Sequence, residues 1–239
     1  MTEPITATTP RPVRPALLAQ RWREVTLLHW PVPVPAVAQL FPPGTRPDTI
    51  DGTTYVGLVP FRMEGVLGLP YLGHFCETNV RLYSVDEAGR RGVVFLSLDA
   101  ARLLPATAGR LAARLPYVWS AMSLTRSGDA VTYTCRRRDS GLTSHMEIQV
   151  GAPIAEPTKL EDFLTARWGL HVSWHGRTLY LPNEHPRWPL HRATLRHFAD
   201  SLVNATGVVI SGPPVSVLHS PGVHVRFGPP LACSSGNQK

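Results

Sequence analysis

Four side chains that can bind a small molecule or move a proton recur at every second position of one apolar stretch. They are Glu77, Asn79, Arg81 and Tyr83. Successive side chains of a β-strand point to opposite faces, so on a strand spanning 75–83 these four share one face. The other face, which is typical of a core, carries Cys76, Thr78, Val80 and Leu82. The polar row lines a small-molecule site if it faces a cavity, and it is a solvated strand face if it faces water.

The row contains an acid and a cation with different chemical uses. Glu77 is the candidate catalytic residue, as a base or, if burial raises its pKa, as an acid. Arg81 has a planar fork of donors that suits a carboxylate. Same-face neighbours on a strand are roughly 6.5–7 Å apart, so Glu77 and Arg81 are expected at about twice that separation and each needs another partner. Either a ligand supplies it, or the row is a buried network that closes the sheet.

Three residues elsewhere are candidates for the same site. Ser97 and Asp99 alternate on the next predicted strand, and they share the face of Glu77 only if the hairpin loop has an odd number of residues. Tyr117 either donates a hydrogen bond into the pocket or only packs. The predicted ligand-binding residues are therefore Asn79, Arg81, Tyr83, Ser97, Asp99 and Tyr117.

The elements that must position these residues are mostly strands. The chain has 239 residues, 43% of them hydrophobic and only 17% charged, which allows a large buried core. Its 24 Pro and 19 Gly between short Val- and Leu-rich runs favour a β-rich fold. We expect a disordered arm at 1–15, one domain at 16–230 and a flexible tail at 231–239.

Local patterns give the expected order of elements. Strands are expected at 24–30, 53–64, 75–83, 93–99, 118–124, 130–138, 142–150, 168–174, 177–182, 208–210 and 223–227. Helices are expected at 16–21, 33–40, 100–115, 157–166 and 190–202. The helix at 157–166 has the best start signal, because Thr158 and Glu161 stand at capping-box spacing.

Charge and cysteine usage exclude several functional classes. The net charge of +7 comes almost entirely from dispersed Arg, since Lys occurs only at Lys159 and Lys239, so we expect no nucleic-acid partner. Three widely spaced cysteines suggest neither a disulfide framework nor a CxxC metal site, which fits a reducing cytoplasm. No apolar run of about 18 residues occurs, so no membrane span is expected. A homo-oligomer remains compatible with the sequence.

Motifs for metals, nucleotides and hydrolytic nucleophiles are missing. The ten histidines include His171 and His175, four apart, but these fall in a predicted hairpin and no HExxH motif is present. No GxxxxGKS, GxGxxG or GxSxG sequence occurs. We therefore expect no metal and no cofactor.

Short motifs along the chain resemble the YqjF-like family of uncharacterised bacterial proteins. The motifs are Asp51-Gly52, Val59-Pro60-Phe61, Phe75-x-Glu77-x-Asn79-x-Arg81-x-Tyr83, Phe95-x-Ser97-Leu98-Asp99, Leu115-Pro116-Tyr117, Phe163-Leu164-Thr165-x-Arg167, Trp188-Pro189-Leu190 and Ser220-x-Gly222-Val223-x-Val225. Together they cover roughly residues 20–228. The resemblance implies an α+β, mostly β fold similar to acetoacetate decarboxylase. That fold is a large curved antiparallel sheet or barrel around a central cavity, with a few peripheral helices.

The same resemblance argues against the decarboxylase reaction. Acetoacetate decarboxylase uses a Schiff-base lysine whose amine pKa is lowered by its site. The matching position here is occupied by Tyr117, while Lys159 is expected at a helix start and Lys239 is the last residue. The acid that precedes the lysine in that family matches Glu77. The resemblance thus implies a pocket acid without the nucleophile.

Three hypotheses follow. The first is a cytoplasmic protein whose polar-lined cavity binds a small organic, anionic molecule. The second is a lyase or isomerase that acts on a keto acid by acid–base chemistry through Glu77 and Arg81. The third is a structural or partner-binding domain.

Overall fold

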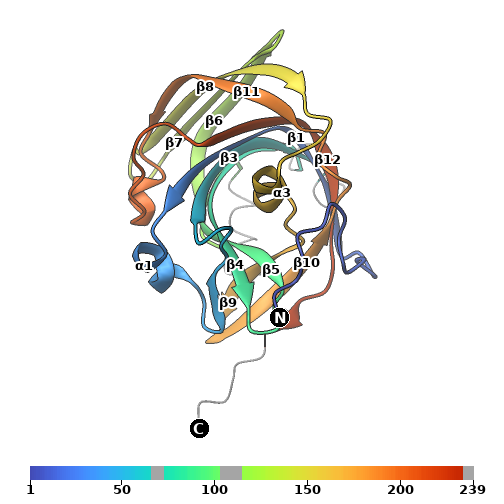
Figure 1. Ribbon diagram of the computed structural model, residues 1–239. Coiled ribbons are helices and arrows are strands. Elements are labelled where there is room, and N and C mark those ends of the chain that lie inside the picture. The colour runs from blue at the N-terminus through green and yellow to red at the C-terminus, as the bar shows by residue number, and fades with distance from the viewer. Residues whose placement is uncertain (66–72, 103–114, 234–239) are drawn as a thin grey trace.

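A computed structural model describes residues 1–65, 73–102 and 115–233 (Figure 1). The fold is mostly β, as expected, and its strands belong to one large curved sheet. The strands are β1 (Leu18–Val32), β2 (Thr45–Pro47), β3 (Thr54–Glu64), β4 (Phe75–Asp86), β5 (Arg91–Ala100), β6 (Tyr117–Ser127), β7 (Ala130–Arg137), β8 (Thr143–Pro153), β9 (Gly169–Trp174), β10 (Arg177–Glu184), β11 (His191–Asp200), β12 (Ser216–Phe227) and β13 (Leu231–Ala232). The helices are α1 (Val34–Val37), α3 (Lys159–Thr165) and the 3₁₀ turns η1 (Ala38–Leu40) and η3 (Asn204–Thr206).

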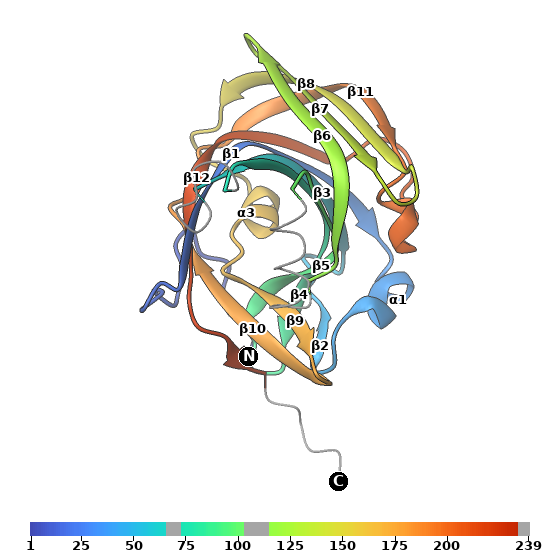
Figure 2. The ribbon, with the colours of Figure 1, turned by 180° about the vertical axis from the view of Figure 1, so that it is seen from behind.

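The sheet forks at two strands and closes on itself. Strand β5 pairs with β4 along one edge, and its other edge pairs with both β6 and β9. Strand β12 likewise pairs with β1 and with both β11 and β10. Strands β1, β3, β4, β5, β9, β10 and β12 form an inner ring, whereas β6, β7, β8 and β11 form an outer layer that packs over one side of it (Figures 1 and 2).

Strand β4 lies in the wall between the outer layer and the inside of the ring. On the outer-layer side, Val80 and Leu82 are fully buried in a cluster with Val131 and Ile148. On the other side, Tyr83 is fully buried against α3. A strand that is covered on both faces has no solvated side, so polar residues on it must find partners inside the protein.

Helix α3 lies inside the inner ring (Figures 1 and 2). Its start follows the predicted capping box, because Thr158 Oγ1 accepts from the Glu161 amide and the Glu161 carboxylate accepts from the Thr158 amide. Phe163 and Leu164 are fully buried, and the Phe163 ring lies 5.7 Å from that of Tyr83. This helix therefore occupies space where the family resemblance implies a central cavity. The resemblance implied helices outside the sheet, but α3 lies inside the ring.

Two predicted helices are strands. Residues 16–21 and 190–202 were expected to be helical from their composition, but β1 begins at Leu18 and β11 spans His191–Asp200. Strand β1 pairs with both β12 and β3, and β11 pairs with β8 and β12. These long-range pairings override the local propensity. The predicted strand at 208–210 is also wrong, and most of the predicted helix at 100–115 lies outside the described residues.

The remaining local predictions agree with the structure. The helix expected at 33–40 is formed by α1 and η1, and the hairpin expected at 168–182 is formed by β9 and β10. Among the residues that the structure describes, no helix is long and apolar enough to cross a membrane.

The two ends of the chain make specific contacts with the domain. Residues 1–15, expected to be a disordered arm, contain no helix or strand, but Val13 is buried and its amide donates to Glu184. In the expected tail, Leu231 and Ala232 pair with β10, and the Cys233 amide donates to the Thr178 carbonyl.

Candidate functional site

The polar row of β4 is buried on the side of the sheet that faces α3. Exposed fractions are 3% for Glu77, 4% for Asn79, 7% for Arg81 and 0% for Tyr83. The β3–β4 register places Glu77 opposite Phe61, in the apolar cluster inside the inner ring. The four residues share one face, as the alternation predicts, and none of them points into bulk solvent.

Glu77 is an acid in an apolar environment. Burial raises its pKa to about 8, and the charge of Asp99 adds to the effect. Tyr117 Oη donates a 3.1 Å hydrogen bond to Glu77 Oε2, which partly offsets the increase. Burial and the neighbouring Glu77 in turn raise the pKa of Tyr117 well above its usual value, so Tyr117 is a donor. At neutral pH the Glu77 carboxyl is therefore mostly protonated and can act as an acid.

Arg81 is a buried cation whose acceptors are uncharged. Its Nη2 donates to Tyr83 Oη at 3.2 Å and to the Leu164 carbonyl at 3.3 Å. Its Nε is buried without a hydrogen-bond partner, and no carboxylate within the described ranges forms an ion pair with it. The Leu164 carbonyl belongs to the C-terminal turn of α3, where the negative end of the helix dipole offsets part of the charge.

Tyr83 connects Arg81 to α3 and to β1. Its hydroxyl donates to the Leu164 carbonyl at 3.0 Å and lies 2.7 Å from Nε2 of His29. Burial, together with the charges of Arg81 and Arg167, lowers the pKa of His29 well below its usual value. His29 is therefore a neutral imidazole at physiological pH, and it adds no charge to the cation beside it.

Asn79 lies between the acid and the cation on the same strand face. It is buried, and its Oδ1 has no hydrogen-bond partner within the part of the chain that is described. An unpaired buried amide oxygen is unfavourable unless a donor reaches it. Asn79 Oδ1 and Arg81 Nε are thus two neighbouring polar atoms of the row with unused capacity.

Ser97 and Asp99 lie on the opposite face of the sheet from Glu77. In the β4–β5 register Asp99 stands opposite Thr78 and Ser97 opposite Val80, before a bulge shifts the pairing. Asp99 faces the outer layer, where it accepts from Nε and Nη2 of Arg137 at 2.8 and 2.9 Å. The predicted grouping of Ser97 and Asp99 with the Glu77 row is therefore corrected: Asp99 forms a buried ion pair between the layers, and Ser97 Oγ donates to Asp99 Oδ2 at 3.5 Å.

Sequence reasoning missed two residues near Arg81. His29 interrupts the apolar run Leu27-Leu28-His29-Trp30 of β1, and this ionisable residue in a buried stretch was the available signal. Arg167 follows α3, is 5% exposed, and donates through Nε to the Phe163 carbonyl at 2.8 Å. Its guanidinium also pairs with Asp48. No local pattern links Asp48 to Arg167, because only the fold brings them together.

No lysine is placed at this site. Lys159 is exposed and lies 3.7 Å from the equally exposed Asp51, and Lys239 is outside the described residues. Tyr117 occupies the position that the resemblance assigns to the Schiff-base lysine, and it contacts Glu77. A Schiff base at Tyr117 is chemically impossible, since a phenol has no amine.

Residues 19–224 match the model of the DUF2071 family, which is described as an uncharacterized conserved protein. The chain belongs to this family. The uncharacterized protein YqjF of Bacillus subtilis (strain 168) is 29% identical to it over 202 residues, covering 81% of this DUF2071 chain and 83% of YqjF.

Solved structures with the acetoacetate decarboxylase-like fold are similar to this DUF2071 chain. Acetoacetate decarboxylase from Legionella pneumophila has a TM-score of 0.65 at 14% identity, covering 95% of this chain and 92% of its own. The enduracididine biosynthesis enzyme MppR, solved in complex with pyruvate, has a TM-score of 0.66 at 14% identity, covering 92% and 91%. At this identity the likeness establishes the fold.

Proposed function

We propose that this protein binds a small organic anion, of the carboxylate class, on the α3-facing side of β4. Arg81 carries the proposal, because it is a buried guanidinium with an unused Nε and no carboxylate partner in the described chain. Burying a charge is unfavourable unless it is paired. A ligand carboxylate would supply the missing negative charge and accept from the free donor of Arg81.

The rest of the row would determine which anions fit. Asn79 offers an unpaired carbonyl oxygen to a hydroxyl or amine donor of the ligand. Glu77, protonated at neutral pH, offers a hydrogen-bond donor instead of a repelling charge. The ligand class is therefore a small carboxylate with a second polar group beyond the carboxylate.

Isothermal titration calorimetry with pyruvate tests the proposal on the full chain. Arg81→Gln is expected to weaken pyruvate binding by about tenfold or more, because a charge-assisted contact is lost. Arg62→Gln, on β3 in a half-exposed pair with Glu64, is the matched control and should bind normally. Unchanged affinity in Arg81→Gln, or no heat with wild type at saturating pyruvate, would refute the proposal.

A second function, acid–base catalysis on a 2-keto acid, is favoured by one observation. Glu77 has its pKa raised to about 8, which is the range of an acid or base working near neutral pH. Pyruvate, which is bound in the similar structure of MppR, is a 2-keto acid. Glu77 would transfer the proton and Arg81 would hold the carboxylate, without a Schiff base.

Solvent exchange at the carbon next to the ketone tests this second function. Protein incubated with pyruvate in D₂O should accelerate deuterium incorporation into the methyl group, seen by proton NMR. Glu77→Gln should abolish the acceleration while retaining pyruvate binding. Exchange that survives the Glu77→Gln change would exclude Glu77 as the proton carrier.

A further inference from the structure

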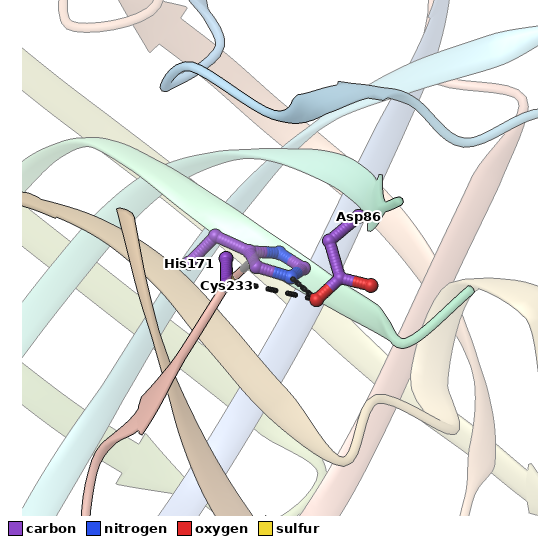
Figure 3. A group of neighbouring side chains, drawn as sticks. All are labelled: Asp86, His171 and Cys233. Atoms are coloured by element: carbon purple, nitrogen blue, oxygen red, sulfur yellow. Dashed lines mark hydrogen bonds and ion pairs between the residues drawn. The ribbon is translucent and has the colours of Figure 1, made fainter. Parts of the chain in front are cut away.

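A second group of functional side chains lies at the opposite end of β4 from Glu77. Asp86 ends β4, His171 lies on β9, and Cys233 follows β13 (Figure 3). One carboxylate oxygen, one imidazole nitrogen and the thiol sulfur lie within 4.8 Å of one another. These residues are far apart in sequence, so no spacing motif announces them.

We propose that Asp86, His171 and Cys233 form a binding site for a divalent transition-metal ion of the zinc class. Sulfur and imidazole ligands select zinc-like ions over magnesium or calcium, which prefer oxygen. Three protein ligands would leave a fourth position for water or an exogenous ligand.

The distances match the edges of a tetrahedral zinc site. His171 Nε2 lies 3.4 Å from Asp86 Oδ2, and Cys233 Sγ lies 3.6 Å from the same oxygen. Zinc bonds of about 2.0–2.1 Å to N or O and about 2.3 Å to S give tetrahedral edges of about 3.3 Å and 3.5 Å. Two of the three edges therefore fit a tetrahedral ion, and the third, between His171 Nε2 and Cys233 Sγ, is no longer than 4.8 Å.

His171 is oriented as metal-ligating histidines are. Its side chain is completely buried, and its Nδ1 lies 2.8 Å from Oγ of Ser84. With Nδ1–H donating to Ser84, the lone pair of Nε2 points towards Asp86 and Cys233. Nε2 is fully enclosed and faces the Asp86 carboxylate at 3.4 Å, but it makes no hydrogen bond of normal geometry among the residues described. A buried imidazole nitrogen that faces a carboxylate and a thiol sulfur without hydrogen-bonding to either is the observation that points to a ligand.

Arg90 is a cation that competes with a metal ion for the Asp86 carboxylate, and its contacts also hold the three residues together. It donates to Asp86 through its amide at 2.9 Å and through Nε at 2.7 Å, and it donates to the Ala232 carbonyl at 3.1 Å. A carboxylate has about four acceptor positions, so Asp86 is able to accept from Arg90 and bind an ion. The Ala232 contact fixes the residue next to Cys233, which keeps the thiol beside Asp86.

Cobalt(II) titration of the full-length, metal-free protein tests the site. One equivalent should give the thiolate-to-cobalt charge-transfer band and the strong visible bands of tetrahedral cobalt, and Zn²⁺ should displace both. Cys233→Ser should abolish the charge-transfer band and weaken Zn²⁺ binding by about tenfold or more. Cys76→Ser, which alters another partly buried thiol, is the matched control. A charge-transfer band that persists in Cys233→Ser, or no stoichiometric binding to wild type, overturns the proposal.

Thiol protection tests the same site without a variant. Wild-type protein is alkylated with iodoacetamide with and without Zn²⁺, and the modified cysteines are located by mass spectrometry. Zn²⁺ should slow alkylation of Cys233 at least severalfold and leave Cys76 unaffected. Equal rates at Cys233 under saturating Zn²⁺ would contradict the proposal.

Discussion

At the scale of single residues, the feature that matters most is an acid whose protonation is set by its surroundings. Glu77 is identified from strand alternation alone, since every second residue from Glu77 to Tyr83 is polar. Its raised pKa is not predictable in that way, because the shift comes from burial inside the inner ring and from Asp99 across the sheet. The contact with Tyr117 likewise depends on β6 returning to β5.

The Glu77 carboxyl predicts how stability depends on pH. Its pKa is 4.5 when unperturbed and about 8 in the folded protein, so the folded state binds the proton more tightly. Stability should therefore fall as pH rises from about 5 to about 8, by about 3–5 kcal/mol. Glu77→Gln should remove this part of the decline and make the variant more stable than wild type at pH 9.

Urea unfolding at pH 6 and pH 9 measures the effect. Glu147→Gln, at an exposed carboxylate on β8, is the control and should retain the wild-type decline. The same decline in Glu77→Gln as in wild type would show that Glu77 is not the buried titrating group.

At the scale of elements, the C-terminal end of α3 provides the acceptor for two residues of the polar row, Arg81 and Tyr83. Arg81 and Tyr83 donate to the Leu164 carbonyl, and Trp188 donates to the Thr165 carbonyl. A buried helix end must have its last carbonyls satisfied, and here β4 and the connection between β10 and β11 supply the donors. The start of α3 was predictable from Thr158 and Glu161, but the donors to its last carbonyls come from segments that are distant in sequence.

Tyr83→Phe should destabilise the protein by about 1–3 kcal/mol. The change removes the hydroxyl that donates to Leu164 and accepts from Arg81, and it leaves those buried groups short of a partner. Tyr55→Phe, whose ring packs on the same Phe163, should cost less than about 1 kcal/mol. Unfolding of both variants in guanidinium chloride measures the difference, and equal losses in the free energy of unfolding would show that the Tyr83 hydroxyl does not stabilise the end of α3.

At the scale of the whole molecule, the fold is a forked sheet in which β4 is covered on both faces. The family resemblance gave the mostly β class, and local patterns gave most strands, but neither gives the fork at β5. That fork depends on parallel pairing of β5 with β6 and β9. A bulge in the β4–β5 pairing, which the sequence does not reveal either, determines on which face of the sheet Asp99 lies. Local patterns also fail at residues 190–202, which form a strand because β8 and β12 pair with them.

The ion pair between Asp99 and Arg137 connects the inner ring to the outer layer. Asp99 is fully buried and also accepts from Ser120 at 2.7 Å. Asp99→Asn should destabilise the protein by about 2–4 kcal/mol, because the Arg137 guanidinium loses its paired charge. Asp139→Asn, at an exposed turn, should change stability by less than about 0.5 kcal/mol. Thermal unfolding measures both, and a small effect of Asp99→Asn would refute this role.

Binding of an anion beside Arg81, on the α3-facing side of β4, is best tested by a crystal structure of the protein grown with saturating pyruvate. Electron density for a carboxylate is expected within hydrogen-bond distance of Arg81, with the ketone oxygen directed towards the protonated Glu77 carboxyl. Pyruvate bound only elsewhere, or a well-ordered row without ligand density at saturation, would contradict it.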